Sequence, residues 1–520
     1  MTAEPLSPIG RRTAADGMAS AAAISLFVLS ACNVGPRYIA PLVPAPPSFK
    51  ESSPAAYSSA PPGTWQPALP QDGVLKGKWW EMLKEPELNA LEEQLNINNQ
   101  NIAQYFQNFM AARAQVSEAR AGFFPTATAD PTVTRSGGGS AGATSSGTTG
   151  VSSTVRGGPF NDFALPFDVS WEPDLWGRVR NTVREYRYAA QVSAADLENE
   201  RLTEQADLAE YFFELRGQDA LQDLYNRTIE ADKQSLDLTR ALVETGIDNQ
   251  EAVAQAEVTF QNAQAAGIGI ATNRALYEHA IATLIGKPAS LFSMPVKMLT
   301  TPVPAIPVGV PSQLLQRRPD IAAAERTMAQ ANAIIGVEKA AYYPTLSLTG
   351  SGGVQSSSIA KLFSIPALAW SLGASASETI FDAGLRKATM AQYTATYKAD
   401  DAAYKQTVLT AFQQVEDYIA TLRVLSAQIV RQDAAVEAAQ RYAQIALARY
   451  QTGLDPYLDV MSAQLILLGD QQTEVTLRVS EMTAAVQLIQ ALGGGWDGTE
   501  LPTTSQVTSK EASRQVANNP

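Results

Sequence analysis

Two segments of the chain alternate between apolar and polar side chains. The apolar positions of the first segment are Phe163, Leu165, Phe167, Val169 and Trp171. Those of the second are Leu368, Trp370, Leu372, Ala374 and Ala376. A period of two predicts β-strands that have one apolar and one polar face. Weaker strands are expected after Pro125 and Pro344, which makes four strands in the chain.

Much longer segments repeat their apolar residues every three or four positions. Neither 178–244 nor 385–451 contains a proline or a cluster of turn residues. Each is therefore predicted to be a single helix, roughly 100 Å long at the rise of an α-helix. In the second, the apolar positions are Val408, Phe412, Val415, Ile419 and Leu422. A final helix continues this spacing through Met461, Leu465, Leu468, Gln472, Val475, Val479, Met482, Val486 and Ile489. A mean spacing near 3.5 predicts a left-handed coiled-coil seam, in which the methionines pack in the core.

The predicted elements occur twice in the same order. Three landmarks recur: an aromatic pair before a proline, an acidic residue before a glycine and an arginine, and a Thr-Gly turn. They lie at 116–126, 172–180 and 240–246, and again at 337–345, 378–386 and 447–453. The first half holds about thirteen more residues between its strands, which the Gly/Ser/Thr-rich run 136–153 accounts for, since insertions fall in loops. The chain is thus predicted to contain one structural unit written twice.

The predicted strands need partners from other chains if they cross a membrane. They are about ten residues long and carry aromatic side chains near their ends, as membrane-spanning strands do. Four strands cannot close a barrel, and open sheet edges are not tolerated in lipid. Three copies would supply twelve strands. We therefore expect a mixed α and β membrane protein, with a helical coiled-coil tunnel and a transmembrane β-barrel formed by a homotrimer; the alternative is a soluble sandwich.

The N-terminus is typical of a secretory signal. Arg11 and Arg12 precede the apolar stretch 18–29, which ends in Leu-Ser-Ala-Cys32 and is too short to span a bilayer. Cys32 is the only cysteine and His279 the only histidine, which excludes a disulfide framework and most metal sites.

These boundaries predict five segments. They are a signal peptide at 1–31, a Pro/Ala/Ser-rich linker at 32–78, repeats at 79–300 and 301–497, and a polar tail at 498–520.

Charge and motifs narrow the function. A net charge of −13 argues against nucleic acid as a partner, because the two would repel. No glycine-rich phosphate loop follows a strand, and no nucleophile has a histidine at a plausible motif spacing, so an enzyme is the weakest alternative.

Several motifs resemble the TolC-like outer-membrane factors, in particular the lipoprotein branch that serves tripartite drug-efflux pumps. They are Trp79-Trp80-Glu-Met-Leu-Lys-Glu-Pro-Glu-Leu-Asn89, Arg317-Arg318-Pro319-Asp320-Ile321 and Ala491-Leu-Gly-Gly-Gly-Trp496. Leu-Ser-Ala-Cys32 also resembles the lipobox, in which the cysteine is acylated, and Asn33 stands where an aspartate would signal retention at the inner membrane.

The resemblance implies a trimeric exit duct in the outer membrane of a Gram-negative bacterium, with no cofactor beyond the lipid on Cys32. Its expected partners are outer-membrane lipid, a periplasmic adaptor and an inner-membrane transporter. For Arg317 to Asp320 a structural role suffices, because Pro319 and Asp320 suit a first helical turn.

The resemblance also implies a periplasmic gate of acidic rings after the glycine turn of each half. The matching residues are Asp248, Glu251, Asp455 and Asp459. Asp248 with Glu251 is spaced as a capping box, and Asp455 precedes a proline, so helix capping is an equal alternative for these three. Asp459 lies one turn further and is the best gate candidate.

The second acidic ring of the family falls on Ser462, and the arginine common one turn later falls on Leu465. A less charged constriction is therefore expected, closed in part by Leu458 and Tyr450. Two alternatives remain open for the whole chain. One is a duct of the same fold that exports proteins, and the other is a lipid-anchored coiled-coil scaffold without a channel.

Overall fold

The computed structural model describes residues 33–41, 45–51, 77–137, 159–299, 301–306, 308, 316–496 and 498–508. The signal segment, Cys32, most of the Gly/Ser/Thr-rich run and the end of the tail lie outside the described residues. The chain divides into two units. The first contains 1–39, 113–188 and 329–399, and the second contains 40–112, 189–328 and 400–520.

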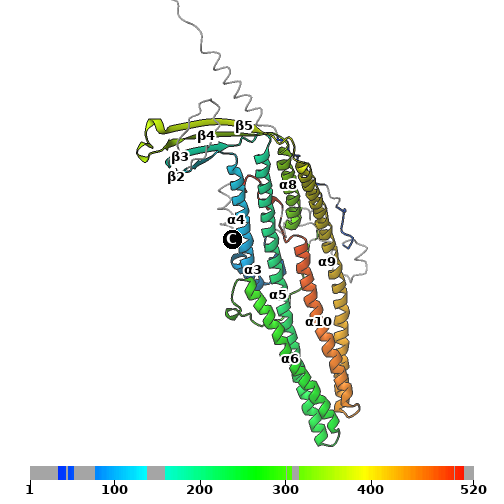
Figure 1. Cartoon of the computed structure of the whole chain (residues 1–520). Coiled ribbons are helices and arrows are strands. Elements are labelled where there is room, and N and C mark those ends of the chain that lie inside the picture. The colour runs from blue at the N-terminus through cyan, green and yellow to red at the C-terminus, as the bar shows by residue number, and fades with distance from the viewer. Residues whose placement is uncertain are drawn as a thin grey trace, which may run out of the picture. The chain divides into compact units, whose positions relative to one another are not determined.

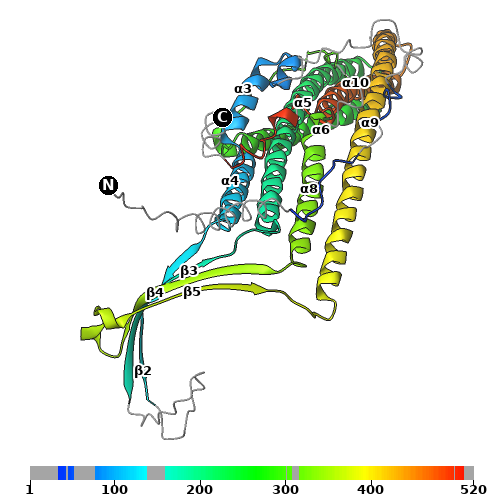
Figure 2. The same ribbon diagram turned by 90° about the horizontal axis from the view of Figure 1, so that it is seen from above.

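The first unit is built on an antiparallel sheet. Its strands are β1 (Thr126–Ala129), β2 (Thr132–Ser136), β3 (Phe160–Trp171), β4 (Thr345–Ser356) and β5 (Leu368–Ser377). Both β1 and β2 pair with β3, which pairs with β4, which pairs with β5. Figure 2 shows β3, β4 and β5 side by side.

The first predicted strand is interrupted rather than continuous. Ala129 lies opposite Phe167 and Thr132 opposite Ala164, so β1 and β2 share one register against β3. Pro131 lies in the gap between them, and proline has no N–H to donate to the ladder. The four predicted strands are confirmed, with this break in the first.

The apolar face of the sheet is exposed in the single chain. Trp370 is 74% exposed and Leu372 is 81% exposed, and every residue of β5 is exposed. The described residues provide no second layer over β5, which argues against a soluble sandwich. Apolar side chains at this density need cover from lipid or from another chain.

The two longest helices begin with the same device. These are α5 (Arg178–Glu244) and α9 (Leu385–Gln451). Asp174 accepts hydrogen bonds from the amides of residues 179 and 180, and its carboxylate also lies 3.0 Å from Nε of Arg180. Asp382 likewise accepts the amide of Arg386 and lies 2.7 Å from its Nε. A carboxylate at a helix start satisfies free amides and favours the positive end of the helix dipole.

The second unit is helical. Its elements, some of which continue into the first unit, are η1 (Trp79–Leu83), α3 (Pro86–Asn98), α4 (Gln100–Ala121), α5, α6 (Gln250–Leu284), η2 (Ala289–Leu291), α8 (Pro319–Ala340), α9 and α10 (Tyr457–Ala491) (Figure 1). The predicted bounds of α5 and α9 are confirmed, and each has 67 residues. None of the helices described is both long and apolar enough to cross a membrane.

The predicted seam is buried along most of its length. Val408, Val415, Ile419 and Leu422 are at most 1% exposed, and Met482 packs in the same core as Ile419. Leu465 is an exception, because it is 53% exposed and leaves the buried positions there to Val460 and Ala463. Its assignment to the seam was therefore wrong for the single chain.

Candidate functional site

The helical hairpins α5–α6 and α9–α10 end in matching turns. Gly246 and Gly453 have φ angles of +74° and +73°, which favour glycine. The amide of Ile247 donates to the carbonyl five residues earlier at 2.9 Å, and the amide of Leu454 does the same at 3.0 Å. This geometry turns both apolar side chains outward, 65% exposed for Ile247 and 68% for Leu454.

Tyr450 ties the two hairpins together. It is 3% exposed and its ring lies 5.4 Å from that of Tyr457. Its hydroxyl donates to Oδ2 of Asp248 at 2.7 Å and lies 3.1 Å from the Thr239 hydroxyl. Burial raises the pKa of Tyr450 to about 12, so the hydroxyl remains a donor at neutral pH. Tyr450 is thus placed between helices, where it joins the end of α9 to the turn after α5.

The capping roles considered for the acidic residues of the first turn are wrong. Asn249, one position after Asp248, caps α6 by accepting the amide of Ala252 at 3.1 Å. Asp248 instead uses one carboxylate oxygen for Tyr450 and the other for the amide of Asn249. Glu251 is exposed and lies 3.4 Å from the side-chain amide of Gln255.

Asp455 does not cap α10 either. The helix begins after Pro456, with no side-chain hydrogen bond at the cap. Asp455 pairs with Arg449, whose Nη2 lies 2.8 Å from Oδ1. The hydrogen bond from Arg449 lowers the pKa of Asp455, so this carboxylate stays ionised and pairs with Arg449 across the α9–α10 turn.

Asp459 is the acidic residue of the second turn that no hydrogen bond occupies. Within the described residues its side chain accepts none, although its charge helps to raise the pKa of Arg449, after the larger effect of Asp455. Leu458 beside it is 48% exposed, and the Ser462 hydroxyl donates to the Leu458 carbonyl at 2.8 Å. Leu458 and Leu465 are therefore exposed and Asp459 is half-buried, whereas the Ser462 hydroxyl is bound to its own helix.

A buried polar cluster above the turns was missed from the sequence. Asp232 is 2% exposed, and one of its carboxyl oxygens has no partner among the described residues. Burial raises its pKa to about 6. Ser235, one turn on, accepts from Nε2 of Gln464 at 3.2 Å, and the buried Tyr457 hydroxyl also has no partner in the described part. The signal was the spacing of Asp232, Ser235 and Thr239, which places polar residues on a helical seam.

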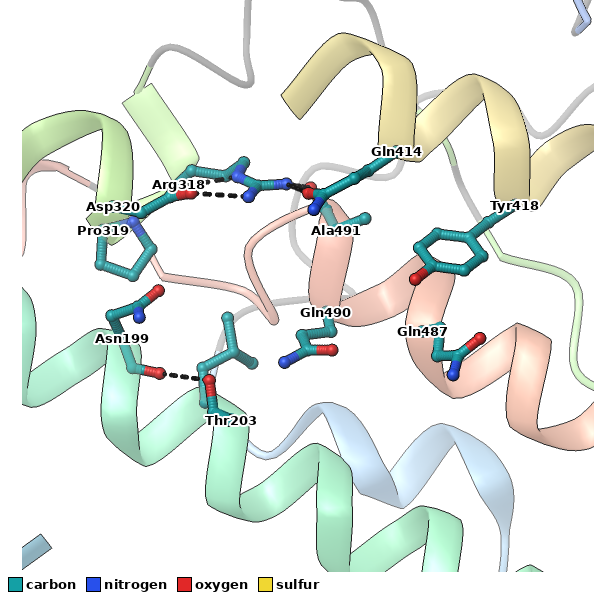
Figure 3. Close-up of a pocket in the computed structure, with 11 residues that line it drawn as sticks. Asn199, Thr203, Arg318, Pro319, Asp320, Gln414, Tyr418, Gln487, Gln490 and Ala491 are labelled. Atoms are coloured by element: carbon teal, nitrogen blue, oxygen red, sulfur yellow. Dashed lines mark hydrogen bonds and ion pairs between the residues drawn. The ribbon is translucent and has the colours of Figure 1, made fainter. Parts of the chain in front are cut away.

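Arg318 has a structural role at the start of α8. It lines a cavity of about 120 Å³ together with residues of α5, α9 and α10. As Figure 3 shows, its guanidinium lies between Asp320, at 2.6 Å, and Gln414, at 2.8 Å. It also donates to the carbonyl of Ala491 at 3.0 Å. Because these bonds occupy the guanidinium, the structure supports fastening of three helices rather than ligand binding.

The chain combines paired helical hairpins with an uncovered sheet, which has four strands when the interrupted β1 and β2 count as one. This arrangement is that of a known class of export channel. The family described as outer membrane efflux protein matches residues 91–287 and 310–494, one stretch in each predicted repeat. The chain belongs to this family, and it is an outer-membrane efflux channel rather than an enzyme.

Individual relatives cover almost the whole chain. The antibiotic efflux pump outer membrane protein ArpC of Pseudomonas putida is 30% identical over 91% of this chain and 95% of its own length. The cation efflux system protein CusC of Escherichia coli is 27% identical over 90% and 97%. The solved structure of the outer-membrane channel OprN is similar, with a TM-score of 0.80 at 27% identity over 89% of this chain and 100% of that chain.

Proposed function

We propose that the chain is the exit duct through which a tripartite pump passes small molecules such as drugs out of the cell. The main support is the exposed apolar face of the sheet, which has four strands when β1 and β2 count as one. Two of these strands, β3 and β5, are followed by helices of 67 residues. Three copies would place twelve strands side by side and cover the open sheet edges. Each pair of long helices would then contribute to a periplasmic tunnel.

A small-molecule cargo is favoured over protein secretion by the relatives. ArpC is described as an antibiotic efflux protein and CusC as a cation efflux protein. Deleting the gene should therefore lower the minimal inhibitory concentration of at least one antibiotic, dye, detergent or metal ion. A plasmid copy of the gene should restore the original concentration. Unchanged sensitivity to the whole panel would favour the secretion duct.

The N-terminal lipid is the second part of the proposal. Leu-Ser-Ala-Cys32 supports acylation of Cys32, and Asn33 supports sorting to the outer membrane. A lipid-anchored scaffold without a channel would be extracted without detergent once Cys32→Ala removes the anchor. The exposed sheet predicts that this variant still requires detergent.

The ends of the hairpins are proposed to bind the adaptor. Ile247 and Leu454 are large apolar side chains that the two turns hold outward in equivalent positions. Apolar side chains presented in this repeated way suit docking of another helical protein. An adaptor and an inner-membrane transporter complete the pump in this proposal.

The gate is proposed to use two kinds of contact. The Tyr450–Asp248 hydrogen bond holds the hairpins against each other, and the Arg449–Asp455 pair holds the second turn rigid. Asp459 is free to face its copies near the threefold axis. Three carboxylates there would repel one another and attract cations.

Asp459→Ala is expected to reduce the preference of the channel for cations, because it removes the ring of charge. The measurement is the reversal potential across a planar bilayer under a salt gradient. Asp237→Ala is the matched control. It removes the same charge from α5, at a side chain that is 62% exposed. If the two variants have equal selectivity, Asp459 does not line the constriction.

A further inference from the structure

The residues directly after Cys32 are held on the first unit by their own contacts. The amide of Val34 lies 3.3 Å from the carbonyl of Trp176, just before α5. Oδ1 of Asn33 accepts from Nδ2 of Asn181 on α5 at 2.9 Å and from the amide of Gly35 at 3.2 Å. A side chain that accepts from two directions is fixed in orientation, so the segment is docked from its first described residue.

The same segment also contacts α8. Nδ2 of Asn332 donates to the carbonyl of Pro36 at 3.3 Å. Tyr38 then packs beside Tyr188 of α5, with ring centroids 6.2 Å apart. Because α5 belongs to the first repeat and α8 to the second, the segment bridges the two repeats.

Three glycines make room for this docking. A Cβ on Gly177 would lie 2.7 Å from Oδ1 of Asn33, and a Cβ on Gly35 would lie 3.0 Å from Cα of Gly336. A Cβ on Gly336 would lie 2.7 Å from Nδ2 of Asn181. Gly336 is inside α8, where alanine would be the better helix former, so its presence needs a packing reason. The reason is the close approach of Asn181 and Gly35.

We propose that residues 33–38 form a latch that closes the seam between α5 and α8 and so fixes the start of the chain that follows Cys32. The side chain of Asn33 is its positioning residue, in addition to any part that Asn33 has in sorting. The lipid anchor would then be attached to both repeats through hydrogen bonds, instead of through a free tether. The contacts of the latch do not depend on acylation. Only the attachment of a lipid to Cys32 rests on the proposed function.

Trypsin cleavage after Arg37 tests the latch, because that exposed arginine lies between the pinned Pro36 and Tyr38. Gly336→Ala and Asn181→Ala both leave the sequence of the signal, Cys32 and Asn33 unchanged. In full-length protein extracted in detergent, each is expected to speed this cleavage about tenfold, the change that loss of one or two hydrogen bonds gives. The released peptide is followed by mass spectrometry.

Gly269→Ala is the matched control, since it is the same change inside a helix with no atom within 4 Å of the new Cβ. If Gly336→Ala and Asn181→Ala are cut as slowly as Gly269→Ala, with unchanged circular dichroism, the latch is overturned. The mass of the peptide ending at Arg37 reports acylation separately. Unmodified Cys32 with faster cleavage in the variants would refute the lipid and keep the latch.

Discussion

Replacing Asp219 by alanine is expected to lower the free energy of unfolding of the helical unit by about 3–5 kcal/mol, the typical result of breaking a buried ion pair by removing one partner. The Asp219 side chain is 1% exposed and lies 3.0 Å from Nη1 of Arg216 and 2.7 Å from Nε of Arg274. It also accepts the amide of Lys297 at 3.0 Å. Without the carboxylate, the guanidinium of Arg216, itself 2% exposed, would keep Glu87 and the carbonyl of Pro295 as partners but would lose its buried counter-charge beside a second cation, Arg274.

Asp223→Ala is the control for this change, because it lies one turn further along α5. Its carboxylate also pairs with an arginine, Arg227, at 3.0 Å, but the two side chains are 42% and 67% exposed. A pair so exposed contributes less than about 1 kcal/mol. Denaturant unfolding followed by circular dichroism should separate the variants. Equal loss in both would mean that Asp219 contributes no more than a surface ion pair.

The long elements were predictable because each carries its own local signals. Nothing in 178–244 or 385–451 interrupts a helix, and glycine turns end both. The strands were predictable from alternation, but the break at Pro131 was not, since it depends on the missing amide in a ladder with β3. The periodicity of a sequence predicts how long an element is. It does not predict interruptions that depend on pairing with another strand.

The acidic residues of the turns were harder to assign because their roles depend on partners in other helices. Asp248 and Asn249 are adjacent candidates for one helix cap, and the structure gives the cap to Asn249. Asp248 is then free for Tyr450, which lies 202 residues away in the chain. A spacing rule sees only neighbours in sequence, so it detected the acidic residue and missed its partner.

The docked segment after Cys32 was missed for the same reason. Its residues appeared to be the start of a linker, rich in proline and alanine, because no periodic pattern marks them. Gly336 inside α8 was the available signal, although it does not reveal which segment approaches it. Gly177 was no signal, because its φ of +87° favours glycine in any case.

Asp232→Asn is expected to raise the stability of the helical unit at pH 7.5 by up to about 3 kcal/mol, since a shift of one pKa unit corresponds to about 1.4 kcal/mol. Burial raises the pKa of Asp232 from 3.8 to about 6. The folded chain therefore holds the proton more tightly than the unfolded chain. Stability from this group is fully present below about pH 4 and is lost as the pH rises through about 6.

Asparagine stays neutral at every pH. The stability of the variant should therefore not fall, as that of the wild type does, when the pH rises from about 4 to 6. The measurement is the unfolding midpoint in guanidinium at pH 4.5 and 7.5. Asp237→Asn, 62% exposed on the same helix, is the control and should keep the wild-type pH dependence. If the midpoints at the two pH values differ as much in Asp232→Asn as in the wild type, Asp232 reaches water in the folded channel. Burial and, after it, the charge of Asp232 raise the pKa of Tyr457, the ring that packs on Tyr450. Because burial disfavours the ionised form of Asp232, its deprotonation would destabilise the end of the bundle where the Tyr450–Asp248 bond holds the hairpins together.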